Sequence, residues 1–140
     1  MDVIDEVTRK RAADAEREVR EKYPEAKVRY EVRGRRGIIT AYMDAFVLSK
    51  EFVETDESLD DPKLLFEYSQ VLRRRARLVV LVPRGRAAAF RLKLLELNNN
   101  WMSYYQLHYY EEWGDIRLVD RETWRRLISL PPEEDPAEMD

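Results

Sequence analysis

Residues 60–97 decide the fold, and they read DDPKLLFEYSQVLRRRARLVVLVPRGRAAAFRLKLLEL. Asp60-Asp61-Pro62 is a helix start, because aspartate caps the first turn and proline is tolerated there. We predict a helix from this point to about Arg77. The continuous apolar run over residues 78–82 is typical of a central strand covered on both faces. A second helix is expected over residues 86–97.

The first third of the chain predicts a helix followed by a hairpin. Residues 2–22 place apolar side chains at helical spacing with charges between them, so they predict an amphipathic helix. Residues 27–33 alternate with a period of two, which predicts a strand whose Val28, Tyr30 and Val32 face inward. Gly34-Arg35-Arg36-Gly37 is expected to form a turn.

The next segment leaves two interpretations open. Residues 38–48 are apolar and rich in β-branched and aromatic types, so we predict a second strand that carries one charge, Asp44. Residues 49–51 could turn and residues 52–54 could form a short third strand. A helix over residues 49–58 is the alternative, because that stretch is poorly patterned.

The last third is expected to add a strand and helices. The aromatic segment 101–113 is interpreted as helical, after a polar stop at Asn98-Asn99-Asn100. Residues 116–119 predict a strand, and Asp120 is expected to cap a short helix that ends at Ile128. The proline-rich acidic residues 131–140 are expected to be a disordered tail to a single domain over residues 1–130.

The element order predicts an α/β fold. A strand, a helix and a further strand in the second half imply a parallel pair, and the hairpin in the first half implies an antiparallel portion. We therefore expect a mixed β-sheet of four to five strands flanked by helices.

The rare residue types exclude several kinds of site. The chain has no cysteine and a single histidine, His108, so disulfides, thiolate nucleophiles and cysteine-based zinc sites are excluded. The N-terminus lacks the apolar run of a signal peptide, and no stretch has the length of a membrane span. We therefore expect a cytoplasmic protein with no membrane partner. Dense mixed charge, with 19 arginines among 25 basic residues, is a hint of heat adaptation.

Charge is distributed unevenly along the chain. The last ten residues hold five acids and no base, and removing them changes the formal net charge from −3 to +2. Residues 68–95 hold eight basic residues and no acid, which makes this block a candidate surface for DNA or RNA phosphates. The candidate nucleic-acid-binding residues are Arg35, Arg36, Arg73, Arg74, Arg75, Arg77, Arg84 and Arg86.

The element order resembles that of the restriction-endonuclease-like superfamily, the PD-(D/E)XK nucleases. Its members place one acid on the second strand, and on the third strand a second acid, a spacer residue and a lysine. Met43-Asp44 and Glu54-Thr55-Asp56 match these two positions, and Glu6, or alternatively Glu16, matches an acid that often comes from the first helix. The resemblance covers roughly residues 2–120.

The resemblance implies Mg²⁺-dependent phosphodiester hydrolysis. Asp44, Glu54 and Asp56 would then be the catalytic set, with Asp44, Glu54 and Glu6 as metal ligands. Carboxylates at adjacent strand ends can hold the ion, which polarises the phosphodiester and activates water. The chain departs from the pattern where Asp56 replaces the lysine, although Lys50 or Lys63 could supply a migrated amine. The departure leaves open whether the chain cleaves nucleic acid or only binds it.

Simpler interpretations stand beside each functional one. Asp44 could be paired with an arginine, and Glu54 and Asp56 could be solvated loop acids. The aromatic segment 101–113 could be core or the interface of a homo-oligomer, which makes a non-catalytic protein-interaction module the alternative function. A phosphate site at the turn Val82-Pro83-Arg84-Gly85 ranks last, because a single glycine is far short of a glycine-rich loop.

Overall fold

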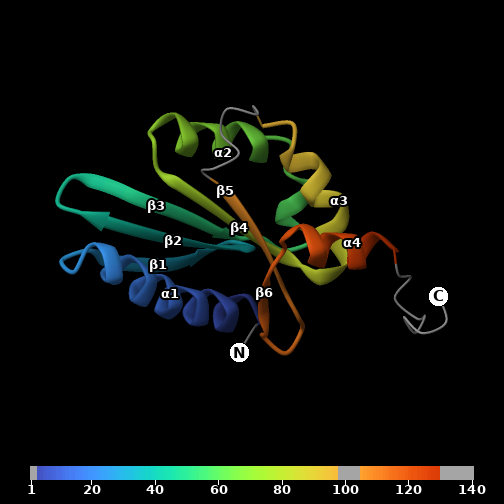
Figure 1. Cartoon of the computed structure of the whole chain (residues 1–140), viewed down its shortest axis with the longest axis horizontal. Helices are drawn as coiled ribbons and strands as arrows, with labels where there is room; N and C mark the ends of the chain where they lie inside the picture. Colours follow the sequence, from blue (N-terminus) through green and yellow to red (C-terminus); the bar gives the residue numbers. More distant parts are fainter. Residues whose placement is uncertain (1–2, 98–104, 130–140) are drawn as a thin grey trace.

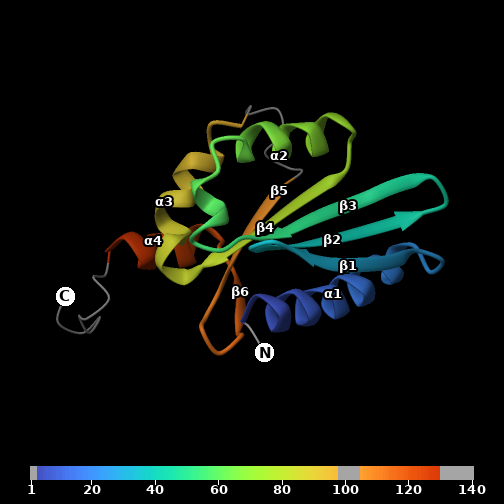
Figure 2. The ribbon, with the colours of Figure 1, turned by 180° about the vertical axis from the view of Figure 1, so that it is seen from behind.

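One mixed six-stranded sheet forms the centre of the molecule, with helices on both faces (Figures 1 and 2). The computed structural model describes residues 3–97 and 105–129. The strands follow chain order across the sheet and are β1 (Lys27–Arg33), β2 (Arg36–Met43), β3 (Phe46–Val53), β4 (Arg77–Pro83), β5 (Tyr105–Tyr110) and β6 (Ile116–Leu118). The helices are α1 (Val3–Lys22), α2 (Leu64–Arg73), α3 (Arg84–Leu94) and α4 (Arg121–Ser129), with a 3₁₀ turn, η1 (Ser58–Asp60).

The strand directions divide the sheet into two parts. Strands β1, β2 and β3 form an antiparallel meander, β3, β4 and β5 are parallel, and β6 returns antiparallel to β5. Helices α2 and α3 make the two connections between the parallel strands. The predicted mixed sheet is therefore confirmed at the level of the α/β class, with one strand more than the upper number expected.

Each face of the sheet has its own apolar core. On one face α1 packs over the sheet, and its Ile4 and Val7 join Ile39, Val79 and Leu81. The other face is covered by α2, α3 and α4, as Figure 1 shows. The largest fully buried side chains there are Phe52, Leu64, Tyr68, Leu72, Leu78 and Leu94. None of the helices within residues 3–97 and 105–129 is long and apolar enough to cross a membrane.

The first helix and first strand agree with their sequence patterns. Helix α1 and strand β1 match the predicted residues 2–22 and 27–33 within one residue. Val28 and Val32 pack against the α1 core as expected, but Tyr30 is 49% exposed. Among the described residues β1 pairs with β2 alone, so no strand of this part of the chain lies beside Tyr30 on its other side.

The predicted second strand exists as β2 but ends at Met43, because a turn and the start of β3 occupy the rest of residues 38–48. The chain turns at Asp44-Ala45 between Met43 and Phe46, which pair with each other, and β3 then runs to Val53. Asp44 has φ +53°, a left-handed conformation that aspartate tolerates better than most residues. Apolar residues on both sides of the turn hid it in the sequence. The alternative helix over residues 49–58 is wrong, since β3 includes residues 49–53.

Helix α2 begins later and ends earlier than predicted. The 3₁₀ turn η1 precedes it, and the Asp61 carboxylate accepts a hydrogen bond from the backbone N–H of Lys63 at 2.9 Å. The helix ends at Arg73, and Arg75 adopts φ +63° as the chain reverses into β4. Strand β4 confirms the predicted central strand. Helix α3 starts directly after Pro83, two residues before the predicted start.

The aromatic segment is a strand where a helix was expected. Residues 105–110 form β5 between β4 and β6, and Leu107 and Tyr109 face one core while Tyr110 faces the other. A strand buried on both faces loses the period of two that marks half-buried strands, which explains the error. Strand β6 and helix α4 confirm the last two predicted elements, and Asp120 caps α4 by accepting the N–H of Thr123 at 2.7 Å. Residues 98–100 and the predicted tail 131–140 lie outside the described residues.

Candidate functional site

The two acids expected to share a metal ion lie far apart. Asp44 sits in the exposed turn between β2 and β3. Glu54 follows Val53, which pairs with Gly37 at the opposite end of the same hairpin. Asp44 is seven positions along the chain from Gly37, which is about 20 Å at the usual rise per residue. The expected convergence of Asp44 and Glu54 is therefore wrong.

Glu54 is fully buried in a hydrogen-bonded network on the face that carries α2. Its two carboxylate oxygens accept from the Arg36 guanidinium at 2.9 and 2.6 Å, and Ser58 donates to Oε1 at 3.0 Å. The Tyr68 hydroxyl donates to Oε2. Burial and the Glu54 carboxylate raise the pKa of Tyr68 well above its ordinary value, so the hydroxyl keeps its proton and remains a donor. Both oxygens of Glu54 are thus occupied by the protein itself.

The remaining members of the expected catalytic and metal set lie elsewhere. Asp56 is exposed and pairs with Arg86 at 3.3 Å. On α1, Glu6 lies 3.8 Å from Lys10, and Glu16 pairs with Arg20 at 2.7 Å. No group of three or more histidine, aspartate or glutamate side chains within the described residues is arranged to hold a metal ion. The expected three-carboxylate centre does not form there.

A second buried carboxylate, which the sequence analysis missed, lies on the opposite face of β3. Glu51 is 3% exposed and accepts two hydrogen bonds from Arg11 of α1, at 2.5 and 3.1 Å. Arg11 also pairs with the half-exposed Glu18 at 2.8 Å. The sequence carried a signal for the burial of Arg11, though not for its partner, because Arg11 falls on the same helical stripe as Val7 and Ala15.

The Arg11–Glu51 pair lines a small cavity of about 200 Å³ between α1 and the sheet. Burial alone would lower the pKa of Arg11, but the hydrogen bonds and charge of Glu51 and Glu18 more than offset it, and the net shift is upward. His108 of β5 is 8% exposed, and burial together with the charges of Arg11 and Arg77 lowers its pKa to about 4. His108 is therefore neutral at physiological pH.

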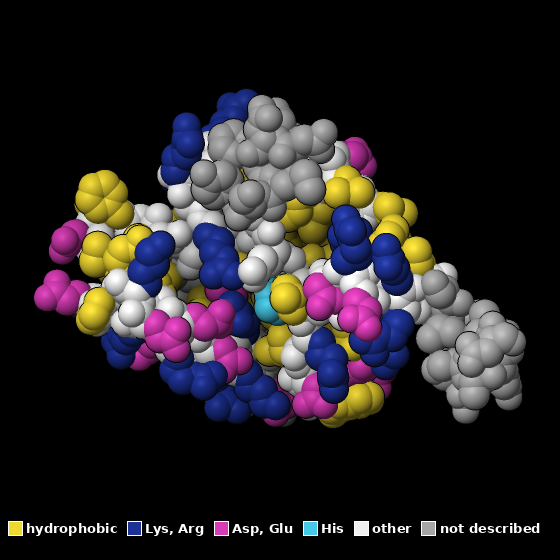
Figure 3. All heavy atoms as spheres, viewed as in Figure 1, with side chains coloured by type: hydrophobic (Ala, Val, Ile, Leu, Met, Phe, Trp, Pro, Cys, Tyr) yellow, Lys and Arg dark blue, Asp and Glu magenta, His cyan; other side chains and the backbone are white. Residues whose placement is uncertain are grey.

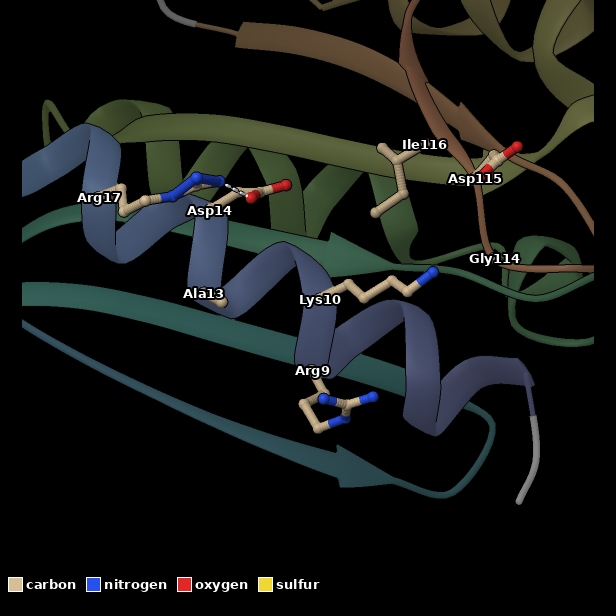
Figure 4. A pocket seen from close by; sticks show the side chains of 8 residues that line it. All are labelled: Arg9, Lys10, Ala13, Asp14, Arg17, Gly114, Asp115 and Ile116. Carbon is tan, nitrogen blue, oxygen red and sulfur yellow. Dashed lines mark hydrogen bonds and ion pairs between the residues drawn. The ribbon is translucent and has the colours of Figure 1, made fainter.

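A larger groove of about 640 Å³ runs beside α1 and is drawn in Figure 4. Lys10 points across it toward Gly114 in the β5–β6 turn, while Arg17 is paired with Asp14. Gly114 has φ +97°, and a Cβ there would lie 3.2 Å from Lys10 Nζ, so the turn and α1 fit closely. Arg9 points away from the other labelled side chains (Figure 4). The groove offers little unpaired charge to a ligand.

The predicted nucleic-acid-binding arginines are divided between two ends of the molecule. Arg35, Arg36, Arg84 and Arg86 lie at the end of the sheet where β3 and β4 finish, and each pairs with an acid. Their acid partners include Glu57, Glu54, Glu111 and Asp56. These four arginines are therefore part of local ion-pair networks and do not form one patch with the others.

The arginines at the end of α2 lie at the opposite end of β4. Arg73 and Arg74 are exposed at the C-terminus of α2, and Arg77 begins β4 and faces the α1 side near Ser49 and Glu51. Dark-blue side chains lie over this end of α2 in Figure 3. Arg75 belongs to the same turn.

Three further cations lie on β1 and β3, on the side of the sheet that carries α2. Val28 and Val32 face α1, so Lys27 and Arg29 point to the other side, and Lys50 points there too because Glu51 faces α1. The register places Arg29, Thr40 and Lys50 in one row across β1, β2 and β3. The Arg29 guanidinium lies 5.5 Å from the ring centre of Tyr42.

We call Lys27, Arg29, Lys50, Arg73 and Arg74 the basic sheet face. Within the part of the chain that the structure describes, none of the five forms an ion pair with an acid. Lys50 lies beside Leu78 of β4, and the turn 74–76 joins that strand to α2, so the two groups of cations approach each other along the sheet. The one acid of β1, Glu31, is paired with Arg33.

The aromatic segment contributes to the core. Tyr109 and Tyr110 are buried, and the Tyr110 hydroxyl donates to the backbone carbonyl of Glu54 at 2.7 Å. Trp113 is 63% exposed and donates to Asp115. Trp101 and Tyr104 lie outside the described residues.

The chain matches no protein-family model, no curated protein and no solved structure. Its function must therefore be inferred from its own geometry.

Proposed function

We propose that this protein binds the phosphate backbone of DNA or RNA through the basic sheet face and does not hydrolyse it at Asp44 and Glu54. The observation that carries the proposal is the row of Arg29 and Lys50 on the α2 side of the sheet, beside the exposed arginines that end α2. Unpaired cations supply most of the affinity of proteins for nucleic-acid backbones, because each contact releases counterions.

Charge and shape both support this surface. The Cα atoms of Arg29 and Lys50 lie two strands apart, about 10 Å, on the same side of the sheet, and Arg29 is exposed. Tyr42 lies beneath Arg29, so an aromatic ring accompanies the cations, as is common on surfaces that bind single strands. By contrast, Arg35, Arg36, Arg84 and Arg86 are engaged by acids.

The absence of hydrolysis is proposed from the state of the two acids. Glu54 would have to lose Arg36, Ser58 and Tyr68 before it could bind a cation, and Asp44 lies about 20 Å away. The order α1, β1, β2, β3, α2, β4 is the order on which the resemblance to PD-(D/E)XK nucleases rests. We therefore propose a non-cleaving relative of that superfamily.

The test compares two triple variants of equal charge change. Lys27→Gln, Arg29→Gln and Lys50→Gln together neutralise the basic sheet face, and Arg117→Gln, Arg121→Gln and Arg125→Gln neutralise three exposed arginines on β6 and α4. Fluorescence anisotropy with labelled duplex and single-stranded DNA and RNA, at about 50 and about 200 mM salt, gives the affinity and its salt dependence.

We expect salt-sensitive binding by the unaltered protein. The first triple variant should weaken it about tenfold or more and reduce the slope of log K against log salt by about 2 to 3, since each lost phosphate contact removes roughly 0.9 from the slope on duplex DNA. The second variant should change both much less. Equal losses of affinity in the two triple variants, or no binding at low salt, would overturn the proposal. If the unaltered protein cleaves nucleic acid with Mg²⁺ and Asp44→Ala abolishes this cleavage, the non-cleaving part of the proposal is wrong.

A further inference from the structure

Strand β1 ends one side of the sheet, and its sequence is complementary to itself. It reads Lys27-Val28-Arg29-Tyr30-Glu31-Val32-Arg33 and pairs within the described residues only with β2. If a second copy of the strand runs antiparallel with Tyr30 opposite Tyr30, then Arg29 faces Glu31 of the other copy twice and Val28 faces Val32 twice. Opposite charges and β-branched pairs directly across from each other stabilise antiparallel strands.

We propose that two copies of this chain pair through β1, antiparallel and centred on Tyr30, and so join their sheets into one of twelve strands. A free strand edge presents unpaired N–H and C=O groups that another strand can satisfy. A twofold arrangement uses the same surface of both copies. The proposal does not depend on nucleic-acid binding.

The exposure of Tyr30 agrees with this axis. Its ring is 49% exposed on the face that carries α1, although its neighbours Val28 and Val32 pack against that core. On the twofold axis the two Tyr30 rings would cover each other. The outermost pairs, Lys27 opposite Arg33, bring like charges together, but Arg33 already pairs with Glu31 at 2.9 Å.

The position of α1 is compatible with the same axis. The Thr8 side chain lies against Gly37, which pairs with Val32, and Arg11 bonds Glu51, whose row across the sheet contains Ile39 and Tyr30. The middle of α1 therefore lies over the row of Tyr30. Helix α1 packs on β1 and β2, so its axis would lie about 5 Å from the twofold axis, and the two helices would be about 10 Å apart.

That separation is the ordinary distance between packed helices. Strand pairing and helix packing thus share one axis.

The first test uses charge reversal. Glu31→Arg places two arginines opposite each other at both crossings, and Arg29→Glu does the same with two acids, so each variant alone should be monomeric by size-exclusion chromatography with light scattering. An equimolar mixture of the two variants restores both opposite-charge crossings and should form dimers, as the unaltered chain does. Circular dichroism should show that both variants fold, because Glu31 and Arg29 are exposed.

Three results in this test would overturn the proposal. The first is that the unaltered chain stays monomeric up to its solubility limit. The second is that Glu31→Arg still forms dimers. The third is that the mixture of the two variants remains monomeric. Since no nucleic acid is present, failure here leaves the proposed binding function untouched.

The second test uses the absence of cysteine in the chain. Directly opposite residues of antiparallel strands have Cα atoms about 5 Å apart, within the range that a disulfide spans. Tyr30→Cys should therefore form a disulfide-linked dimer readily under mild oxidation, whereas Arg121→Cys on exposed α4 should not. Equal rates of cross-linking in the two variants would contradict the proposed axis.

Discussion

Two arginine–glutamate pairs, one made by Glu51 of β3 and one by Glu54 directly after it, differ in what surrounds them. On the α2 face, Glu54 is enclosed by Arg36, Ser58 and Tyr68, and no oxygen is left for another partner. On the α1 face, the pair Arg11–Glu51 lines a cavity. Burial of a carboxylate therefore does not by itself indicate a catalytic group. The partners of each oxygen decide whether it can take a ligand.

The largest effect is expected from breaking the enclosed pair. Glu54→Ala leaves the half-buried Arg36 without its main counter-charge and the buried Tyr68 hydroxyl without an acceptor, so the free energy of unfolding should fall by about 3–5 kcal/mol. Urea denaturation measures it. Asp56→Ala, at an exposed acid two residues away, is the control and should change stability by less than about 0.5 kcal/mol. Equal effects would mean that the network does not stabilise the fold.

The Arg11–Glu51 pair should be replaceable by apolar residues. Arg11→Met leaves Glu51 buried and unpaired, which should cost about 3 kcal/mol, because an uncompensated buried charge is strongly unfavourable. The double variant Arg11→Met with Glu51→Met should recover to within about 1 kcal/mol of the unaltered chain. Denaturation curves of the two variants and the unaltered chain give the free energies of unfolding that are compared. A double variant as unstable as the single one would show that the pair is needed for packing at this site.

His108, whose pKa is lowered partly by the charge of Arg11, should make the stability of the protein depend on pH. The pKa of His108 is about 4 in the fold, below its ordinary 6.5, so the folded chain binds fewer protons between these values and stability falls as the pH decreases through that window. Between about pH 7 and about pH 5 this group should remove about 2 kcal/mol. In urea denaturation, the free energy of unfolding of His108→Gln should therefore fall by about 2 kcal/mol less than that of the unaltered chain over the same pH interval. An identical pH dependence in both proteins would contradict the shift.

The smallest effects are expected from the exposed arginines. Arg86→Ala removes exposed ion pairs with Asp56 and Asp60 and should cost at most about 1 kcal/mol, less at high salt. Arg74→Ala, on the basic sheet face, has no such pair to lose and should change stability by less than about 0.5 kcal/mol. Thermal unfolding at low and high salt measures the loss of stability in each of these two variants. A larger loss for Arg74→Ala would indicate a structural role for the basic sheet face.

Local patterns predicted the elements that are amphipathic or bounded by strong turn signals. Helix α1, strand β1, strand β4 and the cap at Asp120 agree with the sequence, because alternation, helical spacing and capping are properties of neighbouring residues. The hairpin turn at Asp44 and strand β5 were missed. In both places apolar residues continue across a boundary that only pairing with other strands defines.

The candidate site was harder to predict than the fold. Asp44 and Glu54 are close enough in the chain to suggest a shared ion, but the register of β2 and β3 puts them at opposite ends of one hairpin. Arg11 and Glu51 are 40 residues apart, and the residues around each of them do not predict that the two side chains pair. A carboxylate's partners are set by long-range packing, so residue type and spacing do not determine them.

By itself, the sequence determined that this is an α/β protein with no cysteine chemistry, an amphipathic first helix and an excess of arginine in its middle. Only the tertiary structure decided which arginines are engaged by acids and which stay available, and which acids lie together. The physical reason is that charge interactions act through space over a few ångströms. The strand register and the packing of the helices set those distances, and they have no counterpart in the order of residues along the chain.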